Sequence, residues 1–293
     1  MESDSQRERR GIRIVPIVII TLVLVLAALL YDSNTRLVTT EYELHYKNLP
    51  GSFDGFRIVV LSDVHATEFG ENNGSLISKV REAEPDIIAI TGDLVSYGKA
   101  LSIEKQIGIA ERLIDGLLPI APVYFITGNH EWDRRIGGPW ELLSMLEGRG
   151  VHILRNRYVL LESGGDSIVL AGVDDPNGPA DMLKPVELVK MIREAEAEPF
   201  IVLLEHRNNR LALNSRFGID LVLCGHAHGG MIRLPFTDGL IGPARELLPS
   251  YTNGVYTMGN TNMVVSRGVG NQFGWSRFLN NPHIVVAELK VES

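Results

Sequence analysis

Residues 57–65 read RIVVLSDVH, a short apolar run followed at once by polar side chains. The run Arg57–Leu61 predicts a buried strand, because short runs rich in Val and Ile are typical of strands covered on both faces. The same pattern recurs along the chain. It predicts further strands at 86–90, 123–126, 168–171, 200–204 and 220–223.

Helix-like segments alternate with these strands. They have helical spacing of apolar residues, several begin with Ser or Pro, and they cover 75–84, 102–118, 140–149 and 185–194. This alternation predicts an α/β protein. After residue 230, closely spaced Gly and Pro indicate short strands and loops. Met263–Ser266 and Ile284–Leu289 are apolar strands that need a neighbouring sheet, so 56–293 is expected to be one domain.

Polar residues gather directly after the predicted strands. The stretches are SDVH at 62–65, TGD at 91–93, TGNHE at 127–131, EH at 205–206 and CGHAH at 224–228. Open α/β sheets build their ligand crevice at this edge. Taken singly, such an Asp is more often a turn former and such a His a structural residue. Together they supply oxygen and nitrogen donors suited to Zn, Mn or Fe.

Charge and cysteine content exclude several classes of protein. With 28 Lys and Arg against 36 Asp and Glu, the net charge is -8, which disfavours nucleic-acid binding. The single cysteine, Cys224, excludes an intrachain disulfide framework and a Cys-based zinc cluster. We interpret Cys224 as a small buried hydrophobic residue.

An uncharged stretch of 17 residues, Ile14–Leu30, stands near the N-terminus and is apolar all round. It predicts a transmembrane anchor over 14–31, since a core helix would carry one polar face. No small-residue cleavage site follows, which disfavours a cleaved signal peptide; a twin-arginine signal is a minor alternative. Residues 1–13 hold four arginines, whereas only Arg36 and Lys47 follow the anchor closely, so residues 1–13 are predicted to be cytoplasmic. Residues 32–55 are expected to be a tether with a first strand near 41–46.

The strand-end motifs carry a family resemblance. Asp63-x-His65, Gly92-Asp93, Gly128-Asn129-His130-Glu131, His206 and Gly225-His226-Ala227-His228, in this order, resemble the five signature blocks of calcineurin-like metallophosphoesterases. The tail resembles membrane-anchored bacterial members, at 229–235, 265–270 and 281–282. The resemblance implies a four-layer αββα sandwich, two mixed β-sheets flanked by helices, with a two-metal site at one end.

The resemblance also implies roles for individual residues. Asp63, His65 and His228 would hold one metal, and Asn129, His206 and His226 the other. Asp93 would bridge the two ions, and His130 would stand beside the substrate phosphate without being a ligand. The two divalent ions are expected to be Mn or Zn, with Fe as a further choice. The chain departs from the family at 207–210, where relatives place a proline-containing turn; these residues are expected either to contact phosphate or to begin a solvated helix.

The expected activity is that of a membrane-anchored, dinuclear phosphoesterase, in which a metal-bridging hydroxide attacks a phosphodiester or pyrophosphate bond. The domain after the anchor would face outward from the cell membrane and act on a phosphorylated small molecule or an envelope lipid or polymer. No nucleic acid or obligate protein partner is expected. One alternative is a UDP-2,3-diacylglucosamine pyrophosphatase of lipid A synthesis, which requires a cytoplasmic site. A second alternative is a catalytically inactive metal-binding scaffold.

Overall fold

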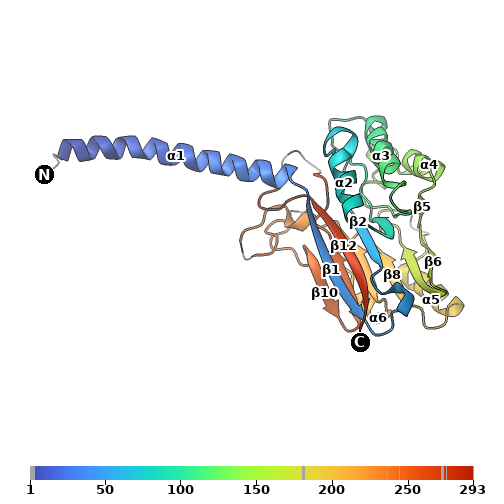
Figure 1. Ribbon diagram of the computed structural model, residues 1–293. Coiled ribbons are helices and arrows are strands. Elements are labelled where there is room, and N and C mark those ends of the chain that lie inside the picture. Colours follow the sequence, from blue (N-terminus) through green and yellow to red (C-terminus); the bar gives the residue numbers. More distant parts are fainter. Residues whose placement is uncertain are drawn as a thin grey trace.

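Two β-sheets packed face to face form the centre of the molecule, which was analysed as a computed structural model (Figure 1). The structure describes residues 4–292 except 180, 181, 236, 244, 272, 273 and 275, and describes no side chains before residue 15. The sequence interpretation of the basic residues 1–13 therefore lies outside the described side chains.

The first sheet has the strand order β1-β12-β2-β3-β4-β5 within the described residues. Its strands are β1 (Val38–Tyr46), β2 (Arg57–Leu61), β3 (Ile87–Ile90), β4 (Val123–Phe125), β5 (His152–Ile153) and β12 (His283–Val291). Neighbours from β2 to β5 are parallel, β12 is antiparallel to β2, and β1 is parallel to β12. The sheet is therefore mixed.

The second sheet has the order β10-β11-β9-β8-β7-β6. Its strands are β6 (Arg157–Ser163), β7 (Asp166–Gly172), β8 (Ile201–Leu204), β9 (Leu221–Cys224), β10 (Gly254–Met258) and β11 (Thr261–Val265). The pairs at its two outer edges are antiparallel and the inner pairs are parallel.

Successive side chains along each strand point to opposite faces of its sheet, and this produces the four layers. Ile58 and Val60 of β2 face the second sheet, where they share a core with Val202 and Leu204 of β8. Val59 and Leu61 face the opposite way and pack under α2 (Gly74–Glu82), α3 (Ile103–Leu117) and α4 (Trp140–Gly148). The outer face of the second sheet packs in the same way under α5 (Pro185–Ala195), and α6 (Leu211–Arg216) contributes Leu211 there. The predicted αββα sandwich is confirmed.

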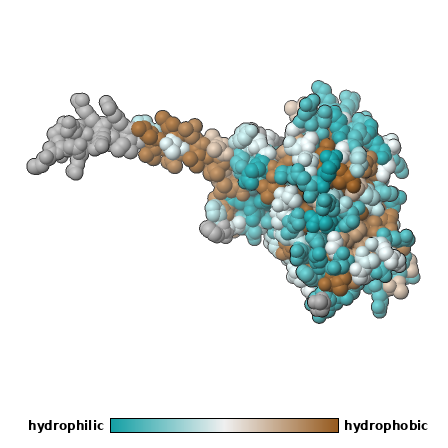
Figure 2. All heavy atoms as spheres, viewed as in Figure 1, coloured by the Kyte–Doolittle hydropathy of each residue, from teal (hydrophilic) through white to brown (hydrophobic). Residues whose placement is uncertain are grey.

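A long N-terminal helix, α1 (Asp4–Thr35), projects from one end of the sandwich. Val15–Thr35 is long and apolar enough to cross a membrane by length and composition, and its apolar side chains lie exposed along the helix (Figure 2). The segment 32–55 differs from the expected tether. Its first residues are the last turn of α1, and after two linking residues β1 begins at Val38 and runs to Tyr46.

Candidate metal centre

The side chains singled out at strand ends meet at one edge of both sheets. Asp63 and His65 follow β2, Asp93 follows β3, and Asn129 and His130 follow β4. His206 follows β8, and His226 and His228 follow β9 in the second sheet. Because β2, β3 and β4 are parallel, as are β8 and β9, the chain emerges from each sheet on one side. Each sheet therefore supplies part of a shared cluster.

Three overlapping groups of ligand atoms form the cluster, and within each group the atoms lie within 4.8 Å of one another. The groups are Asp63, His65 and His228; His65, Asp93 and His130; and Asp93, His206 and His226. Asn129 joins the last group, because its Oδ1 lies 3.0 Å from Nε2 of His206.

Asp93 lies where the groups meet. Its Oδ2 is 3.9 Å from Nε2 of His65 and 3.3 Å from Nε2 of His206. Its other oxygen, Oδ1, accepts a hydrogen bond of 2.8 Å from the backbone N–H of His130. One carboxylate oxygen is therefore fixed by the backbone while the other faces histidines from both sheets.

Buried polar atoms around Asp63 fit a cation. Oδ2 of Asp63 accepts hydrogen bonds from Ser62 Oγ and the His226 N–H, whereas Oδ1 has no hydrogen-bond partner among the described residues. That oxygen lies 3.4 Å from Nε2 of His228, which in turn lies 3.2 Å from Nε2 of His65. An orphaned buried carboxylate oxygen is costly, and a divalent metal with carboxylate and imidazole ligands satisfies it.

Burial sets the protonation of most of the histidines. It lowers the pKa of His226 and of His228 to about 4, and it lowers the pKa of His65 well below its usual value. These rings are neutral near pH 7 and offer lone pairs to a metal. His206 differs: burial lowers its pKa, but the Asp93 carboxylate outweighs burial and raises it to about 10. Metal binding would displace that proton.

The backbone at the cluster adopts an uncommon conformation. Asp63, His65, Asp93, His226 and His228 all have φ between 48° and 66°. This left-handed region is unfavourable for residues other than glycine, and such strain concentrates at functional sites. Gly225 permits a close approach of the two sheets here, because a Cβ at that position would collide with Ser62.

His130 lies beside the cluster in a defined orientation. Its Nδ1 is 3.1 Å from Oγ of Ser96, and the Tyr97 ring stacks on it with centroids 4.4 Å apart. Its Nε2 lies 3.9 Å from Oδ2 of Asp93. Burial lowers the pKa of His130. With Nδ1 engaged by Ser96, Nε2 is the nitrogen that faces the ligand groups.

Two buried residues had no role in the sequence interpretation. The Glu131 carboxylate accepts backbone hydrogen bonds from Asp93 (2.8 Å), Val95 (3.3 Å) and Gly128 (2.7 Å), so it joins the loops after β3 and β4. The sequence feature that could have identified Glu131 is its position directly after His130. Arg277 is buried with Nη2 3.5 Å from Nδ1 of His228. It belongs to the loop-rich tail, where no local pattern marks it.

The residues after His206 make structural contacts. Arg207 forms a two-point ion pair with Asp175, with distances of 2.7 and 3.1 Å, and Arg210 pairs with Glu205 at 3.2 Å. Asn208 donates to the backbone oxygens of Ser250 and Tyr251. Of the two expectations for 207–210, a helix does begin directly after these residues, at Leu211 of α6, and the contact with phosphate stays a prediction.

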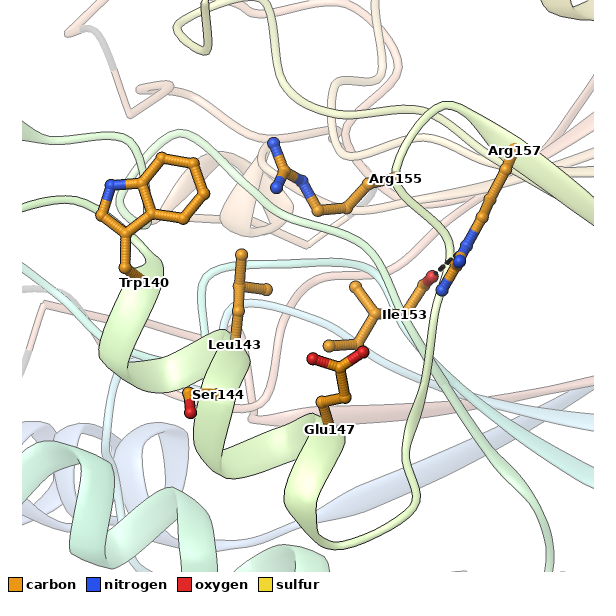
Figure 3. A pocket seen from close by; sticks show the side chains of 7 residues that line it. All are labelled: Trp140, Leu143, Ser144, Glu147, Ile153, Arg155 and Arg157. Carbon is orange, nitrogen blue, oxygen red and sulfur yellow. Dashed lines mark hydrogen bonds between the residues drawn. The ribbon is translucent and has the colours of Figure 1, made fainter.

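A hollow of about 390 Å³ beside α4 lies apart from the metal cluster. Its lining among the described residues holds none of the ligand candidates, and Arg157 within it donates to the backbone oxygen of Ile153 (Figure 3). Figure 3 also shows Trp140 and Arg155 at its rim; Arg155 pairs with Asp174 at 3.0 Å.

A two-sheet αββα sandwich whose strand ends bring together histidine, aspartate and asparagine from both sheets is typical of metal-dependent hydrolases. Residues 56–230 match the calcineurin-like phosphoesterase family model, and the chain belongs to that family. It is accordingly a metal-dependent phosphoester hydrolase of a dinuclear class.

Similar proteins occur in bacteria and animals. An uncharacterised metallophosphoesterase, YkuE, of Bacillus subtilis is 30% identical over 86% of this chain and 85% of its own length. The phosphodiesterase YaeI of Escherichia coli is 28% identical over 80% of this chain and 82% of its own length. A transmembrane protein with a metallophosphoesterase domain from Danio rerio is 31% identical over 73% of this chain, which spans 49% of that protein.

Proposed function

We propose that the chain is a membrane-anchored phosphoesterase that uses two divalent ions, Mn or Zn foremost, to hydrolyse a phosphodiester or pyrophosphate bond. Asp63, His65 and His228 hold one ion; Asn129, His206 and His226 hold the other; Asp93 bridges them. The observation that carries this assignment is the position of Asp93 Oδ2 between His65 and His206.

When bound, two such ions polarise the phosphoryl oxygens and lower the pKa of a water between them. The protein positions the ligands for this chemistry. Asp93 is held by the His130 N–H through Oδ1, and Asp63 by Ser62 and the His226 N–H through Oδ2, so one oxygen of each carboxylate is left for metal.

His130 protonates the leaving oxygen or stabilises charge on the phosphate. The Ser96 contact at Nδ1 keeps the ring from turning, and Tyr97 stacking confines its plane. Because burial lowers its pKa, His130 gives up a proton readily when it carries one.

A phosphodiester is the preferred substrate class, which the name of the Escherichia coli relative, a phosphodiesterase, supports. Membrane anchoring rests on the exposed apolar face of α1 and on the animal relative named as a transmembrane protein. The arginine asymmetry around α1 supports a catalytic domain outside the cytoplasm.

The test of the activity uses the full chain purified in detergent. Metal content is measured alongside hydrolysis of p-nitrophenyl phosphate, bis(p-nitrophenyl) phosphate and UDP-2,3-diacylglucosamine. We expect about two ions per chain and fastest turnover of the diester, with activity lost in EDTA and restored by Mn²⁺ or Zn²⁺.

Asp93→Asn is expected to lose bound metal and turnover while staying folded, since apolar strands supply most of the core. The matched control is Asp115→Asn on α3, whose carboxylate is half exposed. Full metal content and activity in Asp93→Asn would refute the two-metal assignment. Protease added to intact cells tests the orientation: a protected domain would reverse it and favour the cytoplasmic lipid A pyrophosphatase.

A further inference from the structure

The N-terminal helix leaves the domain at the end that carries the metal cluster. β1 begins at Val38 opposite His283 of β12, and β12 runs antiparallel to β2 with Val285 opposite Val60. The start of β1 is therefore level with the end of β2, directly before Asp63. If α1 crosses a membrane, this topology holds the metal cluster close to the membrane surface.

The junction between α1 and the domain is fixed by side-chain hydrogen bonds. Asn34 donates to the backbone oxygen of Arg277 at 2.9 Å and accepts from Nδ2 of Asn271 at 2.9 Å. Ser33 Oγ accepts from the Leu279 N–H at 2.8 Å. The side chain of Arg277 contacts His228 of the cluster. Asn34 and Arg277 therefore connect the end of the helix to the cluster. The domain is thereby held in one orientation relative to α1.

Residues 240–243 and 245–248, which follow His228 after a short loop, pair as the two arms of a small hairpin, with Ile241 opposite Leu247. Leu240 N–H donates to the Ile232 oxygen at 2.8 Å, and Leu248 N–H donates to the Leu240 oxygen at 2.9 Å. At its end, Leu247 is 78% and Leu248 73% exposed, more than any other large apolar residue that the structure describes, those of α1 included. Figure 1 shows the orange loops of this region projecting on the side where α1 leaves the domain.

Two arginines lie near the base of α1: Arg36 follows the helix directly and pairs with Asp32, and Arg267 interacts with it electrostatically. Arg267 is mostly buried, its Nε has no hydrogen-bond partner among the described residues, and it lies within electrostatic reach of Arg36 and Arg233. Clustered arginines attract anionic lipid headgroups. Two protruding leucines on the side of the domain from which an apolar helix leaves are typical of a protein surface that sits in a bilayer interface.

A polar hollow of about 370 Å³ lies at the same junction. It is formed by the end of α1 (Asn34, Thr35), the loop 67–70 that follows His65, and Lys99 with Asn271. The Lys99 ammonium donates to Thr67 Oγ1 at 3.1 Å. Along the chain, Lys99 stands two residues after Tyr97, which stacks on His130.

We propose that the substrate is a phosphodiester of a membrane lipid, taken from the bilayer beside α1, with leucines 247 and 248 in the interface and the headgroup in the Lys99 hollow. The hydrolytic step rests on the proposed function. One water adds across a P–O bond: the phosphorus gains the hydroxyl, the P–O bond to the leaving alcohol breaks, and that alcohol takes the proton.

The membrane contact is tested by site-specific fluorescence. Cys224 is fully buried, so Leu248→Cys can be labelled selectively with NBD in the full chain, reconstituted in nanodiscs of phosphatidylglycerol and phosphatidylethanolamine. The control is Met191→Cys on α5, 50% exposed and far from α1. We expect a blue shift and quenching by nitroxide lipids at position 248 only. Equal, unquenched emission at both positions would overturn the contact.

The substrate is tested in the same nanodiscs by ³¹P NMR of the phospholipids, with bis(p-nitrophenyl) phosphate as the soluble probe. Replacing leucines 247 and 248 together by Asp is expected to lower lipid hydrolysis at least tenfold and to leave the soluble rate within twofold. Lys99→Met is expected to lower lipid hydrolysis at least tenfold. Soluble turnover without any lipid hydrolysis overturns the lipid proposal and leaves the proposed function intact. Loss of both activities in the native chain refutes the proposed function, and the fluorescence result still decides the membrane contact.

Discussion

Replacement of Glu131 by Gln tests whether this buried carboxylate holds the two metal-bearing loops together. Oε2 accepts from the N–H groups of Asp93 and Gly128, and Oε1 accepts the longer bond from Val95. A glutamine keeps one acceptor oxygen for the two short bonds and turns its NH₂ toward the Val95 N–H. One buried donor then loses its acceptor.

Such a loss costs about 1–3 kcal/mol. In a domain of this size each kcal/mol lowers the Tm by about 2–4 °C, so the expected decrease is about 2–12 °C. Glu131→Ala removes the acceptor of all three N–H groups and leaves a cavity, so its decrease in Tm is larger. Because the same bonds position Asp93 and Asn129, metal retention falls along with stability.

The assay is thermal unfolding of the metal-loaded chain, followed by near-ultraviolet circular dichroism. The control is Glu162→Gln on the exposed side of β6, which removes the same charge and is expected to change the Tm by less than about 2 °C. Equal Tm values for the two variants would refute the idea that Glu131 joins the loops.

Three further outcomes are expected. His228→Ala loses about one ion per chain by elemental analysis; retention of both ions would remove it from the ligand set. His130→Ala keeps its metal but turns over roughly 10²–10⁴-fold more slowly, with a smaller loss for nitrophenolate esters than for alkyl esters; loss of metal would make His130 a ligand. Burial, aided by Asp93, raises the pKa of Glu131 to about 8, so the folded chain binds this proton more tightly than the unfolded chain does. Metal-free protein should therefore lose stability relative to Glu131→Gln as the pH rises from about 5 to 8, and parallel pH profiles of the two would contradict this.

The strands that carry the cluster could be predicted because both of their faces are buried. β2, β3, β8 and β9 are short apolar runs, and the polar residues that follow them stand out against that background. Their convergence required one further physical rule, that parallel strands end at the same edge. The ligand candidates could therefore be predicted from the local sequence pattern, whereas their roles rest on the family resemblance.

Contacts between distant segments could not be predicted from local sequence pattern. β1 is an edge strand with mixed, partly exposed residues, so its sequence VTTEYELHY carries little apolar signal, and its partner is β12, more than 200 residues away. The bonds of Asn34 to the loop of Arg277 span a similar separation. A segment that looked like a polar tether is ordered because these distant partners satisfy its polar groups.

The position of β12 imposes an order of assembly. This strand is the last along the chain that the structure describes, yet it lies between β1 and β2, the first two. During synthesis, β1 has no partner strand and β2 is paired only with β3 until residues 283–291 have been made, so the first sheet closes only after β12 emerges. A chain stopped before His283 would leave α1 fastened to an open sheet, with two unpaired strand edges exposed to aggregation.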